Sequence, residues 1–102
     1  MRVLIKATIP LEAGNDLIRD PEMQQRMEAV LGDLKPEAVY FGIADGQRSI
    51  FLIVNMTEAH EMVKIAEPLW LAFEADVECI PVMVQEDFAK AAQHFEELNE
   101  KY

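Results

Sequence analysis

The chain has 102 residues, of which 51% are hydrophobic and 27% charged, a composition that fits one globular domain, residues 1–102, and excludes a disordered or collagen-like chain. Nineteen acidic residues against nine basic ones give a net charge of −10, which disfavours nucleic acid and anionic membrane surfaces as partners because both are negatively charged. No apolar run approaches the roughly 20 residues of a membrane span, and the N-terminus lacks a signal-peptide pattern, so we expect a cytoplasmic protein.

The first predicted elements are a strand and a helix. Residues 2–9 are rich in β-branched and long apolar side chains, which favours a strand. Asp20 followed by Pro21 is typical of a helix start, so we expect a helix from there to about Leu34. Its apolar stripe consists of Met23, Met27, Val30, Leu31 and Leu34. The segment 11–19 between the two could be a loop or an extra turn.

The middle of the chain predicts a hairpin and a second helix. Two strand-like runs, residues 36–44 and 48–56, flank the tripeptide 45–47 (Asp-Gly-Gln), and Asp-Gly between apolar runs is a strong hairpin signal. Thr57 is expected to cap the second helix. Pro68 should interrupt that helix with a kink or a new short turn, because its ring clashes with the preceding turn.

The end of the chain predicts a strand over residues 77–84 and a further helix from Asp87. Pro81 cannot donate a hydrogen bond to a neighbouring strand, so this strand should lie at a sheet edge. The single cysteine, Cys79, is expected to be a small buried hydrophobic residue. The order strand, helix, strand, strand, helix, strand predicts an α+β, ferredoxin-like βαββαβ domain with an antiparallel sheet of order 4-1-3-2 and an extra C-terminal helix.

Side-chain alternation divides each predicted strand into two faces. One face is almost purely apolar, and it contains Val3, Ile5, Ala7, Ile9, Val39, Phe41, Ile43, Ile50, Leu52, Val54, Met56, Val77, Cys79 and Met83. The other is mixed but still holds about seven sizeable hydrophobic residues. Burying one such side chain contributes roughly 1.5 to 3 kcal/mol to stability, so leaving all of them exposed would lose on the order of 10 to 20 kcal/mol. We therefore expect the C-terminal helix or a second copy of the chain to cover the mixed face, and we favour a two-fold homodimer.

The layout, the Ala-Asp-Gly turn after residues 39–43 (Val-Tyr-Phe-Gly-Ile) and the stretch from Pro68 through Phe73 to Val82 resemble the dimeric α/β-barrel superfamily. The likeness is closest to a small family within it that has no assigned function, and it covers most of residues 1–95. The resemblance implies sheets paired face to face in a barrel with a cavity in each half. Members include cofactor-independent monooxygenases, haem-degrading enzymes, lactone isomerases, polyketide cyclases and proteins without known activity, so the fold alone carries no activity.

Four polar residues of the mixed face are candidate site residues. Lys6 and Glu78 lie on strands expected to be antiparallel neighbours, where they could form a buried acid–base pair or a strand-end salt bridge. Tyr40 and Asn55 share that face and could hold a ligand by hydrogen bonds or serve as polar interface residues.

The remaining residues give no sign of a metal or cofactor site. His60 and His94 do not form the His-x-x-x-His pair of a helical metal site, so we expect both at the surface. Trp70 is expected to be a core or dimer contact. No phosphate-binding glycine loop, catalytic triad or Cys-x-x-Cys pair occurs, and we expect no cofactor.

We therefore predict a homodimer that binds a small apolar molecule in a cavity between sheet and helices, with Lys6, Tyr40, Asn55 and Glu78 as ligand contacts. One alternative is a cofactor-independent enzyme of the isomerase, cyclase or monooxygenase type, acting on a hydrophobic carbonyl or aromatic substrate. Another is an acidic interaction subunit whose C-terminal helix, residues 86–102, docks on a basic protein.

Overall fold

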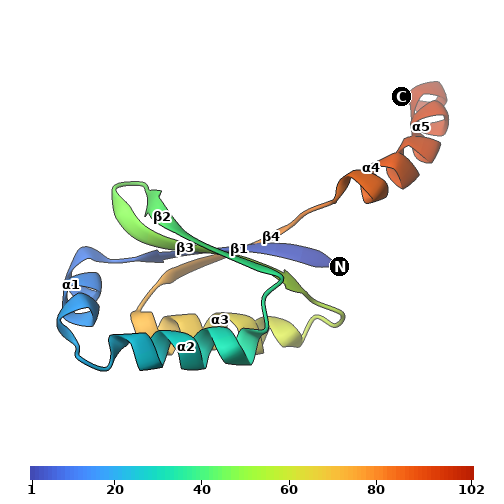
Figure 1. Cartoon of the computed structure of the whole chain (residues 1–102). Helices are drawn as coiled ribbons and strands as arrows, with labels where there is room; N and C mark the ends of the chain where they lie inside the picture. The colour runs from blue at the N-terminus through green and yellow to red at the C-terminus, as the bar shows by residue number, and fades with distance from the viewer.

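A computed structural model describes all residues, 1–102, as a four-stranded antiparallel sheet with three helices on one of its faces (Figure 1). The strands are β1 (Arg2–Ile9), β2 (Ala38–Ala44), β3 (Gln47–Asn55) and β4 (Asp76–Pro81). The helices beneath the sheet are α1 (Leu11–Arg19), α2 (Met23–Leu34) and α3 (Glu61–Phe73). After β4 come α4 (Gln85–Ala91), the short 3-10 helix η1 (Ala92–His94) and α5 (Phe95–Lys101).

The strand order is β2-β3-β1-β4, so β1 and β3 are the central strands. Read from the β4 edge, the same order is 4-1-3-2, an arrangement compatible with a ferredoxin-like fold. The core lies where the central strands face α2 and α3. Its buried residues include Val3, Ile5, Ala7, Ile9, Ile50, Leu52, Val54, Ile65, Leu69 and Phe73.

The β2–β3 hairpin has a two-residue turn. Asp45 and Gly46 have φ angles of 56° and 74°, and positive φ at both central positions is what a type I′ turn requires. The predicted hairpin is confirmed, although β3 begins at Gln47, which the sequence placed in the turn.

Residues 11–19, which the sequence left as a loop or an extra turn, form the nine-residue helix α1. Gly14 lies inside this helix and is buried, because the Arg48 side chain packs directly against it. A Cβ atom at position 14 would lie 2.6 Å from Nη1 of Arg48. The glycine therefore permits a close contact between α1 and β3 and does not end an element.

Thr57 was predicted to cap α3, but the start of this helix is stabilised by the Glu61 carboxylate. The Glu61 carboxylate accepts hydrogen bonds from the backbone N–H of Thr57 at 2.8 Å and of Glu58 at 3.2 Å, and these bonds lower the pKa of Glu61. The predicted interruption at Pro68 was wrong, because α3 runs unbroken to Phe73. Pro68 removes only the donor to the carbonyl of Lys64, which is an exposed residue.

Strand β4 ends at Pro81, earlier than the predicted Val84, and lies at the sheet edge as Pro81 requires. One further backbone bond, from Val82 N–H to the carbonyl of Arg2, continues the pairing with β1. Cys79 was predicted to be buried but is exposed. The reason is its position on the edge strand, which has a neighbouring strand on one side only.

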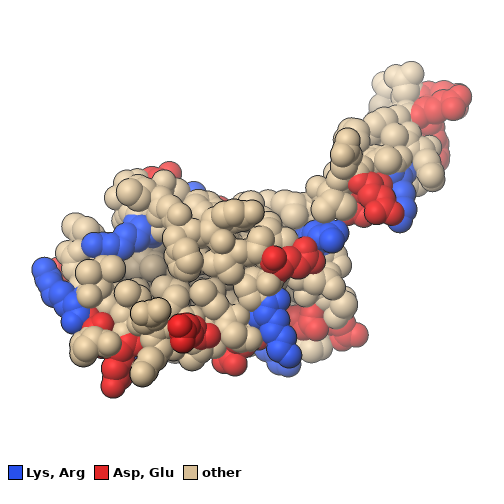
Figure 2. Space-filling model, in the orientation of Figure 1, with Lys and Arg blue, Asp and Glu red and all other residues tan.

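The C-terminal arm, residues 85–102, stands clear of the body of the molecule (Figures 1 and 2). The radius of gyration is 16.9 Å, against about 13 Å for a compact domain of this size. The single further helix predicted from Asp87 is divided into α4, η1 and α5. Its apolar side chains Phe88, Phe95 and Leu98 are each about half exposed. The arm therefore does not cover the mixed face of its own sheet.

We expect Leu52→Ala to lower the free energy of unfolding by about 2 to 5 kcal/mol, because Leu52 is fully buried between the central strands and the helices. Leu71→Ala is the matched control, since Leu71 is 81% exposed on α3, and it should change stability by no more than about 0.5 kcal/mol. Urea denaturation of the three proteins measures both effects. Equal losses for the two variants would contradict this placement of the core.

Candidate functional site

Three of the four predicted site residues lie in one row across the open face, the sheet face that carries no helix. Tyr40 is the cross-strand partner of Phe51, Phe51 is also the partner of Lys6, and Lys6 is the partner of Glu78. Asn55 lies on the same face but four residues beyond Phe51, opposite Arg2. The structure thus brings Lys6 and Glu78 onto neighbouring strands, as predicted, and keeps Asn55 apart.

The closest partner of Lys6 is Asp45 and not Glu78. Lys6 Nζ donates to Asp45 Oδ2 at 2.9 Å, which ties β1 to the tip of the β2–β3 hairpin. This hydrogen bond and the attraction between the two charges raise the pKa of Lys6, to which Glu78 adds a smaller contribution, and they lower the pKa of Asp45. Lys6 therefore keeps its proton more firmly than a free lysine, the opposite of what a proton acceptor requires.

Asn55 is engaged by the start of the chain. Its Oδ1 accepts a hydrogen bond of 2.9 Å from the amino group of Met1, which also donates to the carbonyl of Met56. Tyr40 is 64% exposed at the β2 edge. Neither residue points to a ligand by itself, and the Asn55 amide serves to anchor the N-terminus.

Apolar side chains surround these polar groups on the open face. Leu4, Phe51 and Ile53 are only half-buried on the central strands, and Ile80 is exposed on β4. The body of the molecule shows broad uncharged stretches, while charged groups gather along its helical side and on the arm (Figure 2). Toward the hairpin this face is closed, because Thr8 and Ser49 are buried there. The rest of the open face is therefore a partly apolar surface that no helix covers.

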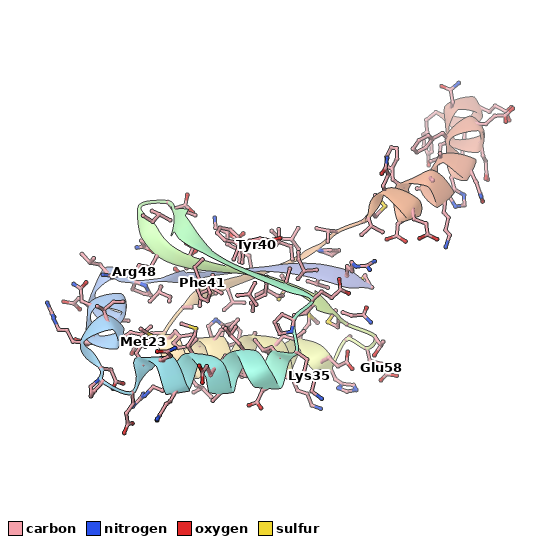
Figure 3. The ribbon with its side chains drawn as sticks, in the orientation of Figure 1. Met23, Lys35, Tyr40, Phe41, Arg48 and Glu58 are labelled. Carbon is pink, nitrogen blue, oxygen red and sulfur yellow. The ribbon has the colours of Figure 1, made fainter.

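A pocket of about 520 Å³ lies on the other face, between β2, β3 and the helices α1 and α2. Eight of its thirteen lining residues are hydrophobic, namely Ile9, Leu17, Ile18, Met23, Met27, Leu31, Phe41 and Ile50. We call it the apolar pocket. Phe41 is 62% exposed there because no helix packs closely beneath the edge strand β2. Figure 3 shows Phe41 and Arg48 on the sheet and Met23 across from them on α2.

None of the four predicted site residues lines the apolar pocket. The physical reason is strand alternation, which turns Lys6, Tyr40 and Glu78 away from the helices and turns Phe41 toward them. Sequence analysis placed Phe41 on the apolar face but treated that face as core. Nothing in the sequence predicted that β2 would extend beyond the helices and leave a gap between Phe41 and α2.

Arg48 is the basic residue of the apolar pocket, and sequence analysis missed it. Its Nη2 donates to Asn15 Oδ1 at 3.1 Å in a partly buried position, while Gly14 lies against its Nη1. No carboxylate lies within 4.0 Å of the guanidinium. A signal was present in the sequence, because the alternation that turns Ile50 and Leu52 inward also turns Arg48 inward.

The other residues considered for chemistry are not assembled into a site. His60 lies 3.2 Å from the Glu58 carboxylate at the surface, and His94 is exposed in η1. Trp70 is also exposed, on α3. Desolvation raises the pKa of the Cys79 thiol, which disfavours the nucleophilic thiolate. No three His, Cys, Asp or Glu side chains lie close enough together to hold a metal ion.

No helix has the length and apolar content needed to cross a membrane. No protein-family model matches the chain, and comparisons with curated proteins and with solved structures found no match. The apolar pocket and the open face are therefore the features of the molecule from which a function can be inferred.

We expect Asp45→Asn to lower stability near neutral pH and to have no effect in acid. The pKa of Asp45 is lowered in the folded state, so its bond to Lys6 stabilises the fold above the ordinary aspartate pKa of about 3.9 and is lost as pH falls through the folded value. Asparagine suits the turn equally well. The urea midpoints of the unaltered protein and of Asp45→Asn, measured near neutral pH and again in acid, test this expectation. An equal shift of the midpoint under both conditions would show that the loss of stability does not come from ion pairing.

Proposed function

We propose that the chain acts as a homodimer that binds a small apolar molecule in the apolar pocket, between sheet and helices. The observation that carries this proposal is the pocket itself. Its volume of about 520 Å³ lies in the range of roughly 300 to 1,000 Å³ typical of small-molecule sites. Such sites combine mostly hydrophobic walls with a few polar groups, as Phe41, Met27 and Arg48 do here.

The dimer part of the proposal rests on the open face. A sheet covered by helices on one side normally presents a polar surface on the other, whereas this face carries half-exposed Leu4, Phe51 and Ile53. A second copy placed face to face would bury these residues, at roughly 1.5 to 3 kcal/mol for each large side chain fully buried. The resemblance to dimeric α/β-barrels supports the same arrangement, in which each protomer keeps its own apolar pocket.

The C-terminal arm favours interaction with another chain as a second candidate function. It carries five acidic residues, Glu86, Asp87, Glu96, Glu97 and Glu100, against Lys90 and Lys101. Its half-exposed aromatic residues, Phe88 and Phe95, pack edge to face, with ring centroids 5.9 Å apart. A free-standing acidic arm with exposed apolar side chains is suited to docking on a basic protein, which is the interaction-subunit alternative.

The enzyme alternative has less support. A proton-transfer mechanism on the open face would need Lys6 or Glu78 to exchange a proton with a substrate in a site from which water is excluded. Lys6 is instead held in its charged form by Asp45. Its neighbours on the open face, Phe51 and Glu78, are half-buried and exposed, so water reaches this surface. Binding without catalysis is therefore our first proposal.

The binding function is tested by titration with N-phenyl-1-naphthylamine, a neutral apolar dye whose fluorescence rises in apolar surroundings. We expect the unaltered protein to bind one dye per chain and Phe41→Ala to bind it about tenfold or more weakly, because a wall of the pocket is lost. Tyr40→Ala is the matched control. Tyr40 is the neighbouring residue on β2 and is similarly exposed, but it belongs to the open face.

Two results would contradict the proposal. One is the absence of dye binding by the unaltered protein. The other is an equal loss of affinity in Phe41→Ala and Tyr40→Ala, which would place the dye outside the apolar pocket.

A further inference from the structure

We propose that the molecule bound in the apolar pocket carries a carboxylate, which pairs with the guanidinium of Arg48. The ligand would then be an amphiphile, with an aliphatic or aromatic body against the pocket walls and an anionic group at the Arg48 end. This inference rests on the proposed binding function and adds the chemical class of the ligand.

Arg48 lacks a counter-charge. The ion pairs of the other basic residues involve Arg2, Lys6, Arg26 and Lys90. The unpaired cations Arg19, Lys35, Lys64 and Lys101 are all exposed to water, so they need no partner. Arg48 alone is both partly buried and without a carboxylate, although the chain has 19 acidic residues to supply one. Partial burial of an unpaired charge is costly, and an anionic ligand removes that cost.

The Arg48 guanidinium is held in position before any ligand arrives. Nη2 is bonded to Asn15 Oδ1 at 3.1 Å, and Gly14 leaves just enough room for Nη1 against α1. A guanidinium has five N–H donors, of which the Asn15 bond uses one. The remaining donors can form the paired hydrogen bonds by which arginine recognises a carboxylate.

The apolar side chains and the positive charge occupy different parts of the apolar pocket. Met23, Met27 and Leu31 of α2 and Phe41 of β2 form an apolar wall beside Arg48. The only acidic lining residue is Glu28, which is exposed on α2. Because Glu28 and the net charge of −10 repel anions, the pocket should favour a ligand with one carboxylate over a ligand with two.

The test compares decanoate with methyl decanoate, which has the same chain and no charge, by displacement of bound N-phenyl-1-naphthylamine. We expect decanoate to bind about ten- to a hundredfold more tightly, as for a hydrogen-bonded charge pair worth about 1.5 to 3 kcal/mol. Arg48→Met, which keeps an apolar side chain of similar length, should abolish this preference. Arg19→Met is the control, because Arg19 is exposed, unpaired and outside the pocket, and it should keep the preference.

A second variant guards against misfolding of Arg48→Met. Asn15→Asp places a carboxylate of α1 beside Arg48 in the partly buried position of the Asn15 amide, so it should remove the preference for decanoate while the neutral dye still binds. Equal affinities for decanoate and its ester, or a preference that survives in both variants, would overturn the carboxylate assignment and leave apolar binding intact. Failure of the unaltered protein to bind even the neutral dye would overturn both proposals.

Discussion

The central constraint on this protein is that helices cover only one face of a sheet whose two middle strands also carry large apolar side chains on the other, mixed face. On β1 and β3, Val3, Ile5, Leu52 and Val54 are buried beneath α2 and α3. On the opposite face, Leu4, Phe51 and Ile53 have no helix above them. The C-terminal arm does not provide the missing cover, because it extends away from the sheet (Figure 1). The stability of the fold and its proposed association both follow from this one-sided cover.

The same constraint produces the apolar pocket. The helices pack under the central strands, and the edge strand β2 extends past them. Phe41 therefore faces α2 across a gap instead of being buried, and the pocket forms between them. Arg48 lies at this pocket because it is the first residue of β3 whose side chain faces the helices. Gly14 and Asn15 of α1 hold that side chain in place. A pocket with apolar walls and one fixed cation distinguishes this site from the open face, where Lys6 is already neutralised by Asp45.

Much of the fold could be predicted from short-range patterns in the sequence. Asp45-Gly46 located the hairpin because few other residue pairs accept positive φ at both positions, and Pro81 located the edge strand because it cannot donate a backbone hydrogen bond. Other features depended on tertiary contacts. The segment 11–19 forms a helix in which Gly14 allows the close contact with Arg48. Pro68 suggested a kink but lies in an unbroken helix, where Leu69 is fully buried.

The site was harder to predict than the fold. Alternation correctly grouped Lys6, Tyr40 and Glu78 on one face, but it could not show that the pocket would form on the other. A pocket forms where the helices end short of the strands that they cover, and no single residue determines how far the strands extend beyond the helices. Arg48 could have been found as the one charge on an otherwise apolar strand face, a pattern that is more informative than polar residues on a mixed face.

The most direct test of the central claim is the mass of the protein in solution, measured by sedimentation equilibrium across a dilution series. One-sided cover of an apolar sheet predicts a dimer with twice the chain mass of 11.6 kDa, which dissociates only at low concentration. A monomer at every concentration would contradict the claim, since it would mean that the open face is stable in contact with water.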